Sequence, residues 1–116
     1  MAKINTKIIY NNEEDILSLS KGIPSKASIE VGDFILDVGS DGFISAIEIL
    51  NASEALNIDK DLLQNIDKSC MNITYKPNYL YIALAFNFKG LEKEIRIPLT
   101  VDLGHKQVQK QEFCFA

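Results

Sequence analysis

Residues 79–88 read Tyr-Leu-Tyr-Ile-Ala-Leu-Ala-Phe-Asn-Phe, and this stretch decides the fold. Side chains alternate between the two sides of a strand, and here both sides carry apolar or aromatic groups. A strand of this kind lies inside a sheet that is covered on both faces. Residues 43–50, Phe-Ile-Ser-Ala-Ile-Glu-Ile-Leu, have the same two-sided character. The sequence therefore predicts two inner strands, one in each half of the chain.

Shorter segments with the two-residue period of a strand surround these two. We expect them at residues 4–10, 16–20, 29–38, 71–76 and 91–101. The period slips at Gly32-Asp33, which indicates a bulge or a tight bend. Asp41-Gly42 is a strong hairpin signal just before residues 43–50. Pro98 cannot donate to a sheet ladder, so it marks an edge strand or the end of pairing.

Two short helices are expected between these strands. Asn51-Ala-Ser-Glu54 is an N-cap with Glu three positions on, and it predicts a helix to about Asn57. Asp59 can cap a second stretch, whose apolar residues repeat at helical spacing: Leu62, Leu63, Ile66 and Cys70. We predict an α+β fold, an antiparallel β-meander of six to seven strands with one or two short helices packed on one face.

Composition and charge limit the class of protein. At 116 residues, 47% hydrophobic and 24% charged, the chain is one globular domain, residues 1–116. The net charge of −4 argues against nucleic-acid binding. No apolar run approaches the roughly 18 residues that span a bilayer, so we expect no membrane partner. Cys70 and Cys114 lie far apart in a chain without a secretion signal, which predicts reduced thiols and a cytoplasmic protein.

The two inner strands expose more apolar surface than one helical segment covers. A second sheet layer, a curled half-barrel or another subunit must cover the other face. From this we predict a homodimer, or binding to a small protein partner.

Residues 7–55 resemble a small archaeal and bacterial family, domain of unknown function 2283. The resemblance rests on Ile9-Tyr10 with the turn after it, on Phe34 to Ile44, and on Ala46 to Ser53. It implies a β-meander that enters a short helix, with no established activity. Some members are encoded beside small toxin-like proteins, which implies an antitoxin role for those members. Residues 56–116, a helix plus a three-stranded meander and a tail, lie outside the resemblance.

Acidic turns are the main candidates for chemistry. Asp37, Asp41 and Glu48 fall near the spacing of a calcium loop, but their flanks alternate as strands, which favours an Asp-Gly turn. Four turn acids can also be imagined as a cluster at one end of the sheet: Asp15, Asp33, Asp37 and Asp41. Nothing in their spacing forces them together. We expect no cofactor.

His105 is the only histidine, and no second His lies at metal-ligand spacing. A zinc site there would need Cys70 and Cys114 brought to it, and Cys114 as a nucleophile would need a base such as His105. We interpret His105 as a surface residue and Cys70 as a small buried hydrophobe.

Aromatic residues are the candidates for partner binding, because tyrosine carries a large apolar area with one polar end. They are Tyr75, Tyr79, Tyr81, Phe113 and Phe115. The alternative for each is a place in the core. We therefore predict a non-catalytic interaction module, and keep a small metal-binding or hydrolytic enzyme that uses Asp37, Asp41 and Glu48 as the alternative.

Overall fold

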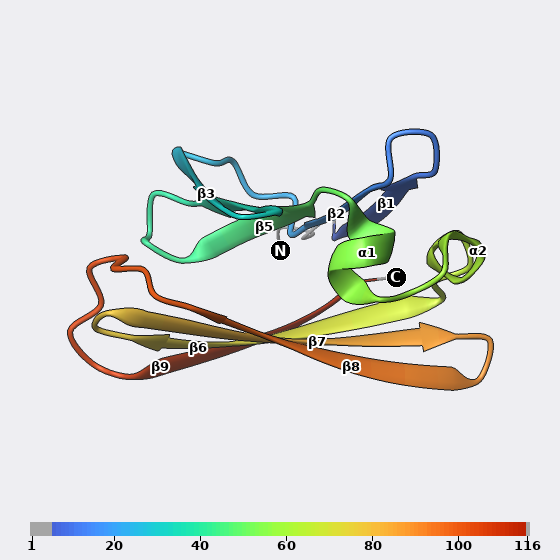
Figure 1. Cartoon of the computed structure of the whole chain (residues 1–116). Helices are drawn as coiled ribbons and strands as arrows, with labels where there is room; N and C mark the ends of the chain where they lie inside the picture. The colour runs from blue at the N-terminus through green and yellow to red at the C-terminus, as the bar shows by residue number, and fades with distance from the viewer. Residues whose placement is uncertain (1–5, 116) are drawn as a thin grey trace.

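The segments with strand periodicity form two antiparallel sheets in the computed structural model, which describes residues 6–115 (Figure 1). The first sheet has the order β1-β2-β5-β4-β3. Its strands are β1 (Lys7–Asn11), β2 (Ile16–Ser20), β3 (Ala27–Val31), β4 (Phe34–Val38) and β5 (Ile44–Ile49). The second sheet has the order β8-β7-β6-β9. Its strands are β6 (Lys68–Lys76), β7 (Tyr79–Phe88), β8 (Leu91–Leu99) and β9 (Gln109–Phe115).

The predicted α+β class and the two inner strands are confirmed. β5 lies between β2 and β4, and β7 lies between β6 and β8. The nine strands of the described chain exceed the six to seven expected. They exceed it because residues 29–38 form two strands joined at Gly32-Asp33, and because the tail forms β9. Ile4, expected in the first strand, lies outside the described residues.

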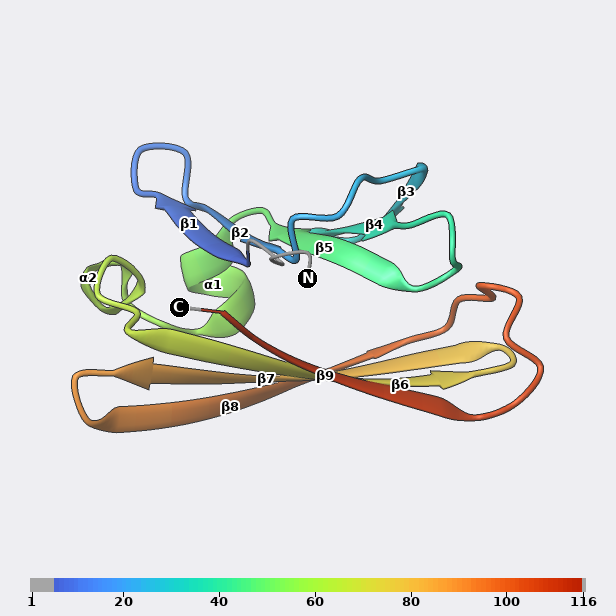
Figure 2. The same ribbon diagram turned by 180° about the vertical axis from the view of Figure 1, so that it is seen from behind.

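The two helices lie between the sheets at one end of the molecule, as both views show (Figures 1 and 2). They are α1 (Ala52–Leu56) and α2 (Lys60–Leu63). The helix expected to reach Cys70 ends at Leu63, and Cys70 belongs to β6. Leu56, Ile58 and Leu63 are buried, so this segment closes one end of the core. Within residues 6–115, neither helix has the length or apolar character needed to cross a bilayer.

The carboxylate at the start of α1 comes from a distant turn. Asn51 occupies the predicted N-cap position of α1, but it adopts φ 49° and its side chain makes no cap hydrogen bond. Instead the backbone N–H of Ser53 donates to Oδ1 of Asp15 at 3.0 Å, and the Ser53 hydroxyl donates to Oδ2 at 2.6 Å. The Tyr10 hydroxyl donates to the same carboxylate at 2.7 Å. Asp15 therefore joins the β1–β2 turn to the helix.

The core lies between the facing surfaces of the two sheets. The first sheet contributes buried side chains from its three middle strands: Leu17, Leu19, Leu36, Ile47 and Ile49. The second sheet contributes Met71, Ile73, Ile82, Leu84, Phe86 and Phe115. The inner faces thus cover each other. Of the three covers that we considered for the apolar strands, the structure has the second sheet layer, so these faces do not require another subunit. Any dimer must rest on a different surface.

Candidate interaction site

The acidic turn of the alternative hypothesis is a hairpin connection. Gly42 adopts φ 84°, a conformation that favours glycine, and the Phe43 N–H donates to Oδ1 of Asp41 at 3.0 Å. Asp37 accepts a hydrogen bond from the Ser28 hydroxyl at 2.7 Å, and Glu48 lies opposite Ile35. No three His, Cys, Asp or Glu side chains converge as a metal site within residues 6–115. The three acids therefore do not form a shared site in this structure.

The wider acidic cluster is not formed either. Asp15 and Asp33 lie beside the start of α1, where Asp33 accepts a hydrogen bond from the Asn51 amide. Asp41 lies in the hairpin turn before β5, close to Lys21 and Tyr75 at the other end of the sandwich. These positions separate the carboxylates instead of pairing them.

Tyr75 and Phe115 belong to the core, so the alternative we gave for these aromatics describes them. The Ile44 N–H donates to the Tyr75 hydroxyl at 2.9 Å, and that hydroxyl donates to Oε1 of Gln111 at 2.8 Å. Burial raises the pKa of Tyr75 to about 12. His105, which we took for a surface residue, is half-buried with its ring centroid 4.6 Å from that of Tyr75. Its Nε2 donates to the Gly42 carbonyl oxygen at 2.8 Å.

Lys21 is a buried amine that the sequence did not mark as special. Only 2% of it is exposed. Its ammonium lies 3.6 Å from the centre of the half-buried Phe113 ring and donates to Oε1 of Gln111 at 3.2 Å. Burial lowers the pKa of Lys21 to about 8, and the Asp41 charge opposes this shift. Lys21, which directly follows β2, therefore connects the first sheet to β9 of the second sheet.

Tyr79 and Tyr81 lie on the outer face of the second sheet, with Ala83 and Ala85 further along the same side of β7. All four are half-buried. A hollow of about 620 Å³ opens here, and the residues that line it come from β6, β7, β9 and the position just before β9. They are Thr74, Lys76, Tyr79, Tyr81, Val108 and Lys110. We call this the tyrosine hollow.

β8 is an edge strand of the second sheet, as Pro98 indicated. Its outer face carries Glu92, Glu94, Arg96 and Pro98, all exposed. Arg96 Nε lies 3.3 Å from Oε1 of Glu94. Tyr81 and Glu94 raise the pKa of the Arg96 guanidinium, which therefore remains charged. Pro98 has no N–H, so its nitrogen faces the free edge of the sheet. Peptide groups two residues apart point in the same direction along a strand, so those of Arg96 and Glu94 also face the free edge.

A largely apolar groove lies beneath this edge. It has a volume of about 340 Å³, and one wall is residues 95–99 of β8. The opposite wall comes from the β3–β4 turn and α1: Val31, Gly32, Asp33, Phe34 and Ala55. Leu91 is 64% exposed at the start of β8. Pro98 was the sequence signal that pointed to this edge.

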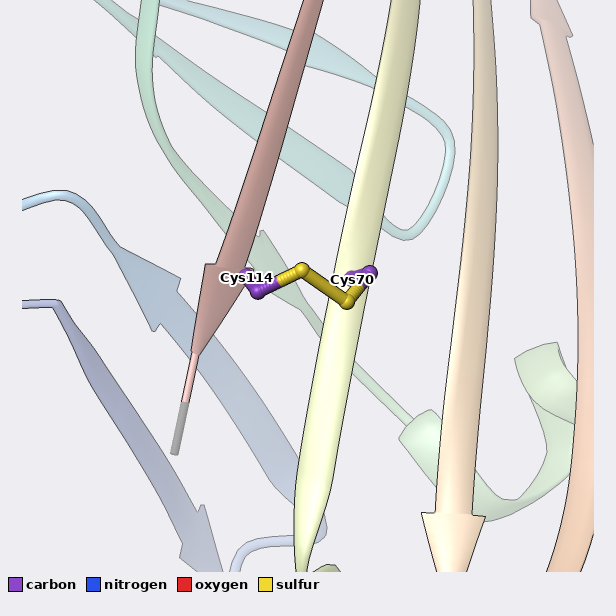
Figure 3. The surroundings of a disulfide bond; sticks show 2 residues. All are labelled: Cys70 and Cys114. Atoms are coloured by element: carbon purple, nitrogen blue, oxygen red, sulfur yellow. A yellow bond between two sulfur atoms is a disulfide. The ribbon is translucent and has the colours of Figure 1, made fainter.

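Cys70 and Cys114 form a disulfide, so the prediction of reduced thiols is wrong (Figure 3). The two residues are directly opposite in the β6–β9 ladder, with Cα atoms 4.0 Å apart. Neither cysteine is available as a nucleophile or a zinc ligand in this state. The premise of unpaired thiols therefore no longer supports a cytoplasmic location.

Comparison with known proteins gives two partial relatives. The chain is 40% identical over 67 residues to an uncharacterized protein of Methanocaldococcus jannaschii, covering 56% of this chain and 58% of that protein. It is 42% identical over 62 residues to a Methanosarcina mazei protein named "Putative hypoxanthine phosphoribosyltransferase", covering 53% and 50%. The chain thus spans about half the length of the curated relatives it matches. No family model matches the chain. No solved structure matches it.

Proposed function

We propose that this chain is a non-catalytic protein-interaction module that works as a homodimer, joined by antiparallel pairing of β8 with β8 of a second copy. The observation that carries the proposal is the self-complementary charge pattern on the free edge of β8. A two-fold axis through Ile95 places Glu94 opposite Arg96 of the second copy, and Arg96 opposite its Glu94. Opposite charges directly across an antiparallel pair stabilise the sheet.

The backbone of β8 suits this pairing. Glu94 and Arg96 direct their peptide groups to the free edge, so each facing pair exchanges hydrogen bonds in the proposed dimer. Glu92 lies opposite Pro98, the one residue that cannot donate. The two second sheets then form one continuous sheet, a recurrent mode of association through exposed edges.

The inner side of the edge also gains from pairing. Ile95 meets Ile95 of the second copy, and the exposed Leu91 comes to lie beside Leu99 at the end of the groove. Burying apolar surface yields about 25 cal/mol per Å², so covering Leu91 contributes to association. The exposure of Leu91 in one chain is thereby explained.

Phosphoribosyl transfer, which the name of the Methanosarcina mazei relative describes, is not part of this proposal. The matched stretch covers half of that protein. In residues 6–115 the strand pairs are all antiparallel, and the helices have five and four residues. Phosphate-binding sites of nucleotide enzymes characteristically use a loop that enters a longer helix.

Size-exclusion chromatography with light scattering tests the dimer at micromolar protein. The natural chain is expected near twice 13.0 kDa. Arg96→Glu and Glu94→Arg each place like charges together, and each is expected to shift the mass to that of a monomer. The double variant Glu94→Arg with Arg96→Glu restores the complementary pattern and is expected to restore the dimer.

Glu112→Arg is the control, because it reverses an exposed charge on β9, at the opposite edge of the same sheet. It should leave the dimer intact. A monomeric natural chain overturns the proposal. A double variant that stays monomeric while folded, as judged by circular dichroism, also overturns it.

A further inference from the structure

The tyrosine hollow is a second surface, separate from the edge of β8, and it is formed by one chain alone. Its floor is aromatic and comes from β7, one of the two inner strands of the second sheet. Val108, 58% exposed, adds apolar surface at its rim. A volume of about 620 Å³ lies within the range of pockets that hold small ligands or a few side chains, roughly 300–1,000 Å³.

Two lysines line this hollow, and neither has an acidic partner among the described residues. Lys76 and Lys110 are exposed, and no carboxylate of the described residues lies within 4.0 Å of either ammonium. The Lys76 ammonium lies 6.0 Å from the centre of the Tyr79 ring. An aromatic floor with two unpaired positive charges is complementary to a ligand that carries both apolar and anionic groups.

We infer that the tyrosine hollow binds an acidic segment of a protein partner, one in which carboxylates flank an aliphatic or aromatic side chain. The apolar side chain rests against Tyr79, Tyr81 and Val108. Its flanking carboxylates reach Lys76 and Lys110.

The charges around the hollow favour a peptide over a nucleic acid. Glu112 follows Lys110 on the same side of β9, and Glu94 lies on the outer face of β8. A continuous phosphate backbone that leaves the hollow along the sheet meets these carboxylates. The whole chain also has a net charge of −4, which opposes polyanion binding. Isolated carboxylates placed only at the hollow avoid this repulsion.

Fluorescence anisotropy with defined probes tests this site on the natural full-length chain. The first probe is a fluorescein-labelled peptide that repeats Glu-Leu-Glu-Phe. The others are a Lys-Leu-Lys-Phe peptide of equal length and a single-stranded RNA of equal length. Only the acidic peptide is expected to bind, and more weakly as salt screens the charges. Tighter binding of the RNA, or equal binding of both peptides, overturns the inference.

The chain offers a matched pair of charge variants. Lys76 and Lys68 are both exposed, on the same side of β6 and at its opposite ends, and only Lys76 lines the hollow. Lys76→Glu is expected to weaken binding of the acidic peptide at least about tenfold, whereas Lys68→Glu should change that affinity by no more than about twofold. Tyr79→Thr, which keeps a residue suited to a strand, is expected to weaken it similarly to Lys76→Glu. Equal losses in Lys76→Glu and Lys68→Glu show general charge attraction and overturn the site.

The dimer and the hollow fail separately in these tests. The variants that test the dimer change β8, with their control on β9, and the anisotropy variants change β6 and β7. A monomer that still binds the acidic peptide at the hollow supports this inference and contradicts only the proposed dimer.

Discussion

The ammonium of Lys21 lies 3.2 Å from the side-chain oxygen of Gln111, ninety residues further along the chain. The same oxygen accepts a hydrogen bond from the Tyr75 hydroxyl, so one amide oxygen accepts from two donors between the sheets. Gln111 is neutral, and a neutral acceptor compensates a buried charge less well than a carboxylate does. Lys21 is therefore a site where folding and protonation are linked.

Stability is expected to rise with pH because of Lys21. Its pKa is about 8 in the folded state against 10.5 for the ordinary group, so between these values the unfolded chain binds more protons. The free energy of unfolding should increase on the order of 2 kcal/mol from pH 8 to pH 10. Urea unfolding of the natural chain and of Lys21→Met measures this, and Lys21→Met should lack the rise.

Lys26→Met is the matched control, because Lys26 is exposed and close to Lys21 in the chain. It should keep the rise. The rise in the free energy of unfolding should end above pH 10. The pKa values of Tyr75 and Tyr10 are about 12 in the folded chain, so these tyrosines ionise first in the unfolded chain, and this favours unfolding. The same slope in the natural chain and in Lys21→Met would contradict the assignment.

Asp15 is expected to hold the β1–β2 turn against α1. Burial raises the pKa of its carboxyl group, but hydrogen bonds from Ser53 and Tyr10 outweigh this and lower the pKa below 3.8. Its contribution is present above the unfolded value and is lost as pH falls through the folded one. Asp15→Asn keeps a residue that tolerates the φ of 56° and should cost about 1–2 kcal/mol at pH 7.

Chemical denaturation at pH 7 and pH 3 checks the Asp15 prediction. The cost of Asp15→Asn should shrink at the lower pH, because the carboxyl group of the unfolded chain, with its ordinary pKa of 3.8, takes up a proton there. Asp33→Asn is the comparison, because its hydrogen bond to Asn51 is exposed and should contribute little. Equal effects of the two substitutions would argue against a special role for Asp15.

The disulfide is expected to stabilise the chain by about 4 kcal/mol, because it closes a loop with a sequence separation of 44 residues in the unfolded state. Thermal melts with and without a thiol reductant measure this loss. Cys70→Ala with Cys114→Ala should melt at the temperature of the reduced natural chain and should not respond to reductant. A natural chain whose melting temperature ignores reductant would contradict this prediction.

The strands with apolar alternation could be predicted because their period reports which side is buried. The Asp41-Gly42 turn and the edge position of β8 follow from local rules for glycine and proline. The resemblance of residues 7–55 to domain of unknown function 2283 stays a prediction.

The rest depends on contacts between distant residues. β9 begins Gln-Lys-Gln-Glu, which carries no strand periodicity of its own, and it forms by pairing with β6. Lys21 has no local pattern that marks it as buried, since its neighbours Gln111 and Phe113 lie at the other end of the chain. The side-chain acceptor at the start of α1 could not be predicted for the same reason. Asn51 occupies the N-cap position, but the carboxylate that accepts from the Ser53 N–H belongs to the distant Asp15.

The disulfide between β6 and β9 also limits how two copies of the chain can exchange strands. β9 follows a connection over residues 100–108 that contains no strand, the kind of hinge that allows neighbouring molecules to exchange a terminal element. With Cys114 joined to Cys70 of its own chain, that exchange requires breaking a covalent bond. In the oxidised protein, domain swapping of the last strand is closed off until a thiol opens the bridge.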